Sequence, residues 1–155
     1  ELEAKVGETD DLLSRDLSMA YDKTGVMFTL PISCVGQAAR LEDTEIKNLT
    51  EIFAKLAVAY QIRDDEADYL GNKTGRATMS DILNDRPNLY YLLSKSEAHA
   101  PDLFKHASNF HEKLIEEAEV GLEAFPNSLT LMTRELVLPF VQLTKSPDPS
   151  CNLAY

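Results

Sequence analysis

The feature that most constrains this chain is a long apolar repeat that runs directly into a group of acids. Apolar side chains recur at the i, i+3, i+4, i+7 spacing of one helix face, at Ile46, Leu49, Ile52, Phe53, Leu56, Ala57 and Tyr60. The same helix then carries Gln61, Asp64 and Asp68 on one side, with Asp65 turned from Asp64 by about 100°. The pattern predicts a helix whose buried face continues into three carboxylates and an amide.

These acids are unfavourable in this position unless something offsets their charge. Like charges one turn apart repel, partial burial increases the repulsion, and the C-terminal end of a helix disfavours negative charge. A Mg²⁺ ion would offset all three costs, because it prefers oxygen ligands and keeps waters or substrate phosphates in its shell. From spacing alone, an acidic solvated helix end with Arg63 as a local partner remains the alternative.

Basic residues follow the acids in a loop marked by glycine and proline. After Gly71 the chain reads Gly75-Arg76, Ser80-Asp81-Ile82 and Asp85-Arg86-Pro87. A metal-chelated diphosphate needs carboxylates for the ion and Lys or Arg for the remaining phosphate oxygens. Together with Tyr60-Gln61-x-x-Asp64-Asp65-x-x-Asp68, the ordered string resembles the second aspartate-rich motif and following loop of the trans-isoprenyl diphosphate synthases, also called polyprenyl synthetases.

Two upstream segments are similar to the same family. Gly7-Glu8-Thr9-Asp10-Asp11-Leu12 resembles its Gly-Gln-x-x-Asp-Leu helix start, with Glu in place of Gln, and Lys23-Thr24-Gly25 resembles its Lys-Thr-Gly. The resemblance implies catalytic roles for Lys23, Thr24 and Gln61, the last two by presenting oxygen dipoles to an allylic cation. It also implies diphosphate binding by Lys23, Arg76 and Arg86, and Mg²⁺ binding by Asp64, Asp65 and Asp68.

The activity that the resemblance implies is a Mg²⁺-dependent prenyltransferase reaction. An allylic diphosphate ionises, and the double bond of isopentenyl diphosphate attacks the resulting cation. The family's first aspartate-rich motif precedes the Gly-Gln helix start, and nothing before Gly7 could supply it. We therefore expect a chain that is inactive without an N-terminal half or a partner subunit carrying that motif. The alternatives are a non-catalytic regulatory subunit of a heteromeric prenyl diphosphate synthase, or a helical bundle with an acidic surface.

The expected fold is all-α, half of an isoprenoid-synthase-type helical bundle around a central cavity. We expect residues 1–145 to form the helical domain and residues 146–155 a flexible tail. The uncharged run over residues 24–39 predicts a buried helix, bent or interrupted at Pro31. Further helices are expected over residues 89–93, 100–124 and from 129, the last kinked or ended at Pro139.

Charge and composition exclude several other classes of protein. The formal net charge of −11 argues against nucleic acid and anionic membranes as partners. The uncharged run is short and polar for a transmembrane segment, and no signal peptide is evident, so we expect a cytoplasmic protein. Cys34 is expected to be a buried, reduced thiol, and His99, His106 and His111 to lie on the surface. The family resemblance implies a homo- or hetero-oligomer.

Overall fold

The computed structural model describes residues 18–72, 75, 77–84, 86, 88–95 and 100–142, and every regular element among them is helical. The prediction of an all-α fold is therefore confirmed. The segment Gly7–Leu12 and the expected tail over residues 146–155 lie outside the described residues. Within the described helices, none combines the length and the hydropathy needed to cross a membrane.

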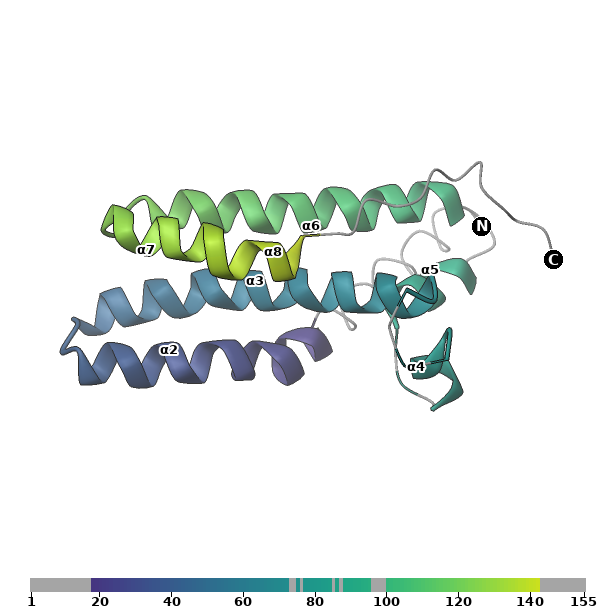
Figure 1. Cartoon of the computed structure of the whole chain (residues 1–155), viewed down its shortest axis with the longest axis horizontal. Coiled ribbons are helices and arrows are strands. Elements are labelled where there is room, and N and C mark those ends of the chain that lie inside the picture. The colour runs from purple at the N-terminus through teal and green to yellow at the C-terminus, as the bar shows by residue number, and fades with distance from the viewer. Residues whose placement is uncertain are drawn as a thin grey trace, which may run out of the picture.

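Helix α3 (Asp43–Tyr69) is the central element, with α2 (Val26–Ala38) along one side and α6 (Ala100–Leu122) along the other (Figure 1). It begins with a capping box, in which the backbone N–H of Glu42 donates to the Glu45 carboxylate at 3.0 Å. The apolar repeat in the sequence predicted this helix.

The other helices lie around the site described below. Helix α4 (Ser80–Leu83) and helix α5 (Leu89–Lys95) lie beside the C-terminal end of α3 (Figure 1). After α6 the chain turns back through α7 (Asn127–Met132), a π-helical turn η2 (Thr133–Val137) and α8 (Leu138–Val141). This returning segment lies beside both α6 and α3, because Leu138 and Val141 pack into the core between them.

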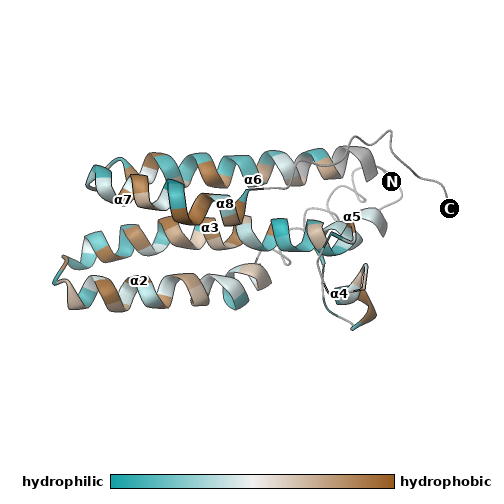
Figure 2. Ribbon diagram, in the orientation of Figure 1, coloured by the Kyte–Doolittle hydropathy of each residue, from teal (hydrophilic) through white to brown (hydrophobic). Residues whose placement is uncertain are grey.

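Two hydrophobic clusters bind these helices to α3, and apolar residues line the inner sides of the helices in Figure 2. The larger one joins α3 to α6 and α8 through Ile52, Phe53, Leu56, Ala59, Ala118, Leu122, Leu138 and Val141. The smaller one joins α3 to α5 and α6 through Val58, Ile62, Leu89, Tyr90 and Ala107. The apolar stripe predicted for α3 is therefore its core face, and it continues to the acidic end.

Two glycines let helices approach α3 closely. A Cβ atom on Gly36 of α2 would lie 2.8 Å from Cγ1 of Ile46, and one on Gly121 of α6 would lie 2.8 Å from Cγ1 of Ile52. Real Cβ atoms are not found so close to other carbons, so each glycine is required for the observed helix spacing.

The expectation of a buried α2 is wrong. The helix packs mainly on α3 and on the π-helical turn η1 (Tyr21–Gly25), and Gly36 is its one buried residue. Its opposite face is uncharged and exposes Val26, Met27, Leu30 and Val35. Cys34 is likewise exposed, not buried. Pro31 interrupts nothing, because it lies on the exposed side, where water can bind the Met27 carbonyl that loses its helical partner.

The surface assignment of His111 is also wrong. Its side chain is 2 % exposed, because α8 closes over this part of α6. Its Nε2 lies 2.5 Å from the Val141 carbonyl oxygen, and burial lowers the pKa of the imidazole. The neutral ring therefore donates to that carbonyl. His99 and the side chain of His106 lie outside the described part of the chain.

Candidate functional site

Three carboxylates meet where the C-terminal end of α3 approaches α4. Asp64 and Asp65 of α3 and Asp81 of α4 each offer one oxygen, and these oxygens all lie within 4.8 Å of one another. Asp65 and Asp81 are buried, at 3 % and 8 % exposed. Three hard oxygen donors so close together fit a small divalent cation such as Mg²⁺.

Asp68 is not part of this group, although the sequence placed it with Asp64 and Asp65. Its side chain turns away and is buried, accepting a hydrogen bond from Ser80 Oγ at 2.5 Å and one from the Asp81 N–H at 3.0 Å. Asp68 thereby starts α4 and fixes the position of Asp81. The sequence analysis had noted Ser80-Asp81-Ile82 but gave Asp81 no role.

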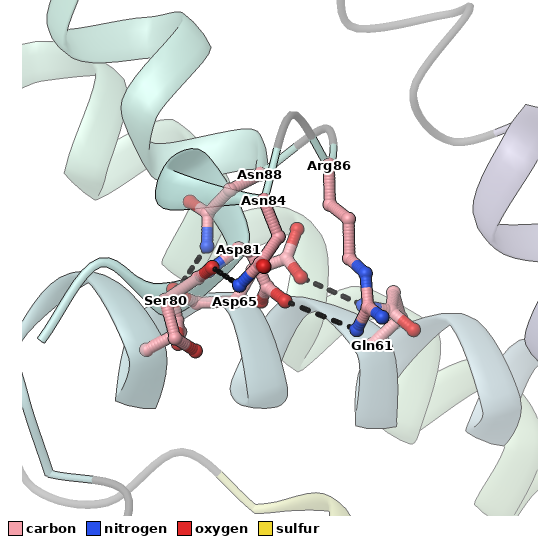
Figure 3. A network of polar contacts seen from close by, with 8 residues as sticks. Gln61, Asp65, Ser80, Asp81, Asn84, Arg86 and Asn88 are labelled. Atoms are coloured by element: carbon pink, nitrogen blue, oxygen red, sulfur yellow. Dashed lines mark hydrogen bonds and ion pairs between the residues drawn. The ribbon is translucent and has the colours of Figure 1, made fainter. Parts of the chain in front are cut away.

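Asp65 connects the cluster to α5. Gln61 Nε2 donates to its Oδ1 at 2.7 Å (Figure 3). The Leu89 N–H at the start of α5 donates to its Oδ2 at 2.8 Å. Asn88 Nδ2 donates to the Asp65 backbone carbonyl at 3.0 Å. Both carboxylate oxygens of Asp65 therefore accept hydrogen bonds, which stabilises the charged form.

Thr24 extends this hydrogen-bonded chain to η1. Its hydroxyl donates to Gln61 Oε1 at 2.7 Å, so the two ends of the Gln61 amide are held by Thr24 and Asp65. Thr24 is buried within a π-helical turn, a local widening of a helix that is frequent at functional sites. The structure thus joins Thr24, Gln61 and Asp65 into one network.

Two of the three predicted cations lie near the acids. Arg86 is exposed, with Nη1 3.9 Å from Asp81 Oδ1, and its backbone N–H donates to the Asp81 carbonyl at 2.8 Å (Figure 3). Lys23 is exposed on η1 and lines the same pocket as Asp64 and Asp81. Arg76 lies outside the described residues.

The pocket that these residues share has a volume of about 600 Å³. Its polar lining residues are Lys23, Thr24, Gln61, Asp64, Asp81 and Arg86. Its apolar lining residues are Met27, Phe28, Tyr60, Leu136, Val137, Phe140 and Val141. A ligand with a charged group and an apolar part would match both kinds of lining.

Comparison with known families identifies the chain. A model of the polyprenyl synthetase family matches residues 2–120. The chain belongs to the polyprenyl synthetase family. No significant match was found among curated proteins or among solved structures. Membership confirms the resemblance seen in the sequence and supports a transferase of the prenyltransferase type that acts on prenyl diphosphates.

The polyprenyl synthetase match covers the acids and basic residues of the site but not the whole pocket wall. It ends at residue 120, before α7, η2 and α8 begin. Leu136, Val137, Phe140 and Val141 therefore come from a part of the chain outside the match.

A further buried acid lies next to the cluster and was not noted in the sequence. Burial raises the pKa of Glu66, and burial followed by the charge of Glu66 raises the pKa of Tyr90. The Glu66 carboxylate and the Tyr90 hydroxyl lie close enough to affect each other, although Glu66 Oε2 and the hydroxyl do not meet the strict geometry of a hydrogen bond among the described residues. Tyr90 of α5 belongs to the smaller hydrophobic cluster and Glu66 lies on α3, so the pair is part of the packing of α3 against α5.

Proposed function

We propose that this chain takes part in the Mg²⁺-dependent condensation of isopentenyl diphosphate with an allylic diphosphate. It would supply the second aspartate-rich motif and part of the allylic diphosphate site. The observation that carries the proposal is the meeting of Asp64, Asp65 and Asp81 at a pocket whose rim also holds Lys23 and Arg86.

The proposed metal site uses Asp64, Asp65 and Asp81 as ligands, with Asp68 positioning Asp81. Bound Mg²⁺ supplies positive charge that stabilises the departing diphosphate. Lys23 and Arg86 would bind the remaining diphosphate oxygens as exposed cations in the lining of the pocket. Arg76 is proposed for the same role on the strength of the sequence motif.

Thr24 and Gln61 would act on the carbon end of the diphosphate. Thr24 donates its proton to Gln61, which leaves the lone pairs of its hydroxyl oxygen available to face an allylic cation in the pocket. Gln61 holds that orientation and the position of Asp65 at the same time. Both effects are electrostatic preorganisation, which is the largest contribution in many enzymes.

We propose that the family's first aspartate-rich motif is also needed for turnover and comes from an N-terminal half or a partner subunit, so that the active form is an oligomer or a longer bundle. The described residues hold one group of three clustered acids, which is consistent with half of such a site. The exposed uncharged face of α2 is consistent with half of a bundle, since patches of this kind are usually covered.

A regulatory subunit is the alternative, and replacement of metal ligands separates the two roles. In the assembled enzyme, Asp64→Asn and Asp81→Asn should each lower prenyltransferase activity by orders of magnitude if these groups hold the metal. Glu51→Gln is the matched control, since it removes one charge from an exposed position of the same helix. Unchanged activity in both aspartate variants would favour the regulatory role.

The same variants can be compared in the chain alone. Calorimetric titration with inorganic diphosphate should show binding that requires Mg²⁺ in the wild type and in Glu51→Gln, but not in the aspartate variants. No Mg²⁺-dependent binding in the wild type would instead favour a helical bundle with an acidic surface.

A further inference from the structure

Helix α5 contacts two consecutive residues of the aspartate-rich motif on α3. The backbone N–H of Leu89 donates to Asp65 Oδ2 at 2.8 Å. Tyr90, the next residue of α5, lies beside Glu66, the next residue of α3, and its hydroxyl is close enough to the carboxylate for the two to affect each other. Because consecutive residues of a helix point about 100° apart, two such contacts restrict the rotation of α5 as well as its distance from α3.

Both members of the second contact are buried, although each carries a polar group. The side chains of Glu66 and Tyr90 are 7 % and 1 % exposed. Burial raises the pKa of the Glu66 carboxyl, and the Tyr90 hydroxyl and then the charge of Arg63 act in the opposite direction. The hydroxyl is therefore one of two groups that offset the cost of burying this acid.

The packing of α5 does not itself require this polar pair. The ring of Tyr90 packs against Phe104 and Tyr69, with ring centroids 5.0 and 6.2 Å away, and these contacts do not involve the hydroxyl. A buried polar pair is often no more stabilising than apolar side chains of similar size, but it can specify one arrangement of the elements that it joins. The arrangement at issue is the position of the Leu89 N–H on Asp65.

We propose that Glu66 and Tyr90 are positioning residues for the metal ligand Asp65. Their contact keeps the Leu89 N–H on Asp65 Oδ2, and this bond keeps the Asp65 carboxylate within the group of three acids. Glu66 and Tyr90 act through Asp65, because they belong neither to that group nor to the lining of the pocket. The inference rests on the proposed function, which assigns Mg²⁺ to the three acids. It gives a task to Glu66, which occupies a position that the aspartate-rich motif leaves open.

The test measures how much Mg²⁺ the whole chain needs for half-maximal binding of inorganic diphosphate in calorimetric titrations. Tyr90→Phe keeps the ring and removes the hydroxyl, so the required Mg²⁺ concentration should rise on the order of tenfold, the value of one hydrogen bond to a charged group. Excess Mg²⁺ should restore binding, because all three acids remain. Hydrogen exchange of the same variant should show a less protected Leu89 amide, since this N–H donates to Asp65.

Three further variants separate the contact from charge and from packing. Glu66→Leu removes the contact from the side of α3 and should match Tyr90→Phe in both measurements. Glu66→Gln removes the same charge but keeps a carbonyl oxygen that can accept from the Tyr90 hydroxyl, so its Mg²⁺ requirement should stay near that of the wild type. Tyr69→Phe removes a hydroxyl from the neighbouring ring and should leave both measurements unchanged. Urea denaturation shows that each variant is folded.

The other outcomes contradict either the inference alone or the proposed function as well. If the wild type binds inorganic diphosphate in Mg²⁺ but Tyr90→Phe and Glu66→Leu need no more of the ion, or leave the Leu89 amide equally protected, the inference is overturned and the proposed function stands. The same holds if Glu66→Gln loses as much as Glu66→Leu, since the charge and not the contact would then matter. If the wild type does not bind inorganic diphosphate in Mg²⁺, the proposed function is overturned and the inference with it.

Discussion

Asp65 and Asp68 each lie at the end of one helix and at the start of another. Negative charge is disfavoured at the C-terminal end of α3 but favoured at the N-terminal ends of α5 and α4. The N–H groups of Leu89 and Asp81 donate hydrogen bonds to these carboxylates. These bonds offset part of the electrostatic cost of placing acids at the C-terminal end of α3, which is the cost that led us to expect a metal ion. Variants of Asp64 and Asp81 therefore test the proposed Mg²⁺ binding most directly.

Removal of the Asp68 carboxylate should therefore loosen α4 before it affects anything else. Asp68→Ala deletes the acceptor for Ser80 Oγ and for the Asp81 N–H, and we expect a loss of about 1–2 kcal/mol in the free energy of unfolding. Urea denaturation measures this loss, and hydrogen exchange should show a less protected Asp81 amide. An equally protected amide in the variant would contradict the role of Asp68 in holding α4.

His111 should make stability depend on pH. Burial lowers its pKa in the folded state, so the unfolded chain binds more protons below the ordinary value of 6.5. The free energy of unfolding should thus fall as pH drops from 6.5 toward the lowered pKa. His111→Gln removes this titration, and the difference between the two proteins in urea midpoint should shrink as the pH falls from 7 to about 5.5. A constant difference would show that His111 does not titrate in this range.

The sequence predicted that Asp64 and Asp65 lie close together because both are on one helix, and the structure has them in one cluster. Helical spacing could not bring in Asp81, which comes from α4 after a loop and whose backbone N–H is held by Asp68. Spacing also could not show that Asp68 accepts hydrogen bonds from Ser80 and from the Asp81 N–H of α4. The burial of His111 depends on α8, which folds back from far along the chain.

At the scale of elements, periodicity predicted the helices and missed how they pack. The starts of α5 and α6 and the extent of α3 follow from apolar spacing and from Pro and Ala-Pro signals. The two π-helical turns that border the pocket have no such signal. η2 ends two residues before Pro139, and the Leu138 N–H donates to the Thr133 carbonyl. Helical structure continues through Pro139 into α8, so the helix does not end at this proline.

The contact of α6 with α3 depends on Gly121, which has no side chain. Gly121→Ala would place a Cβ 2.8 Å from Ile52 Cγ1, and we expect a net loss of about 1 kcal/mol in the free energy of unfolding, despite the higher helix propensity of Ala. In an Ile52→Ala background the same change meets no clash and should be stabilising. Thermal or urea unfolding of the wild type, the two single variants and the double variant completes a double-mutant cycle. A stabilising effect in both backgrounds would mean that the helices can move apart freely.

The two sides of the described bundle differ in how much apolar surface they leave exposed. Helix α3 is covered by α6 and the returning segment on one flank, whereas α2 covers the other flank and presents an uncharged face to solvent (Figure 2). The charge pattern showed that residues 24–39 are uncharged, but it could not show whether another helix covers their outer face. A buried helix was expected because such a run is usually covered on all sides.

The open face should make the isolated chain self-associate. Sedimentation velocity should show a rising average mass with concentration, and Leu30→Glu should weaken the association on the order of tenfold, the value of one buried leucine. Gln37→Glu adds the same charge to the same helix without removing apolar surface and serves as the control. A strictly monomeric wild type at all concentrations would contradict this expectation.

The bond from Leu89 to Asp65 also gives the site an optical readout. Tyr90 follows Leu89 directly and packs against Phe104 and Tyr69, with ring centroids 5.0 and 6.2 Å away. The chain contains no tryptophan, so its near-ultraviolet circular dichroism comes chiefly from tyrosines held rigidly in such clusters. Any change in the Asp65 carboxylate reaches the start of α5 through one hydrogen bond. Binding of Mg²⁺ at the acidic cluster should therefore change the near-ultraviolet circular dichroism of Tyr90, which can be measured without a label and without enzymatic turnover.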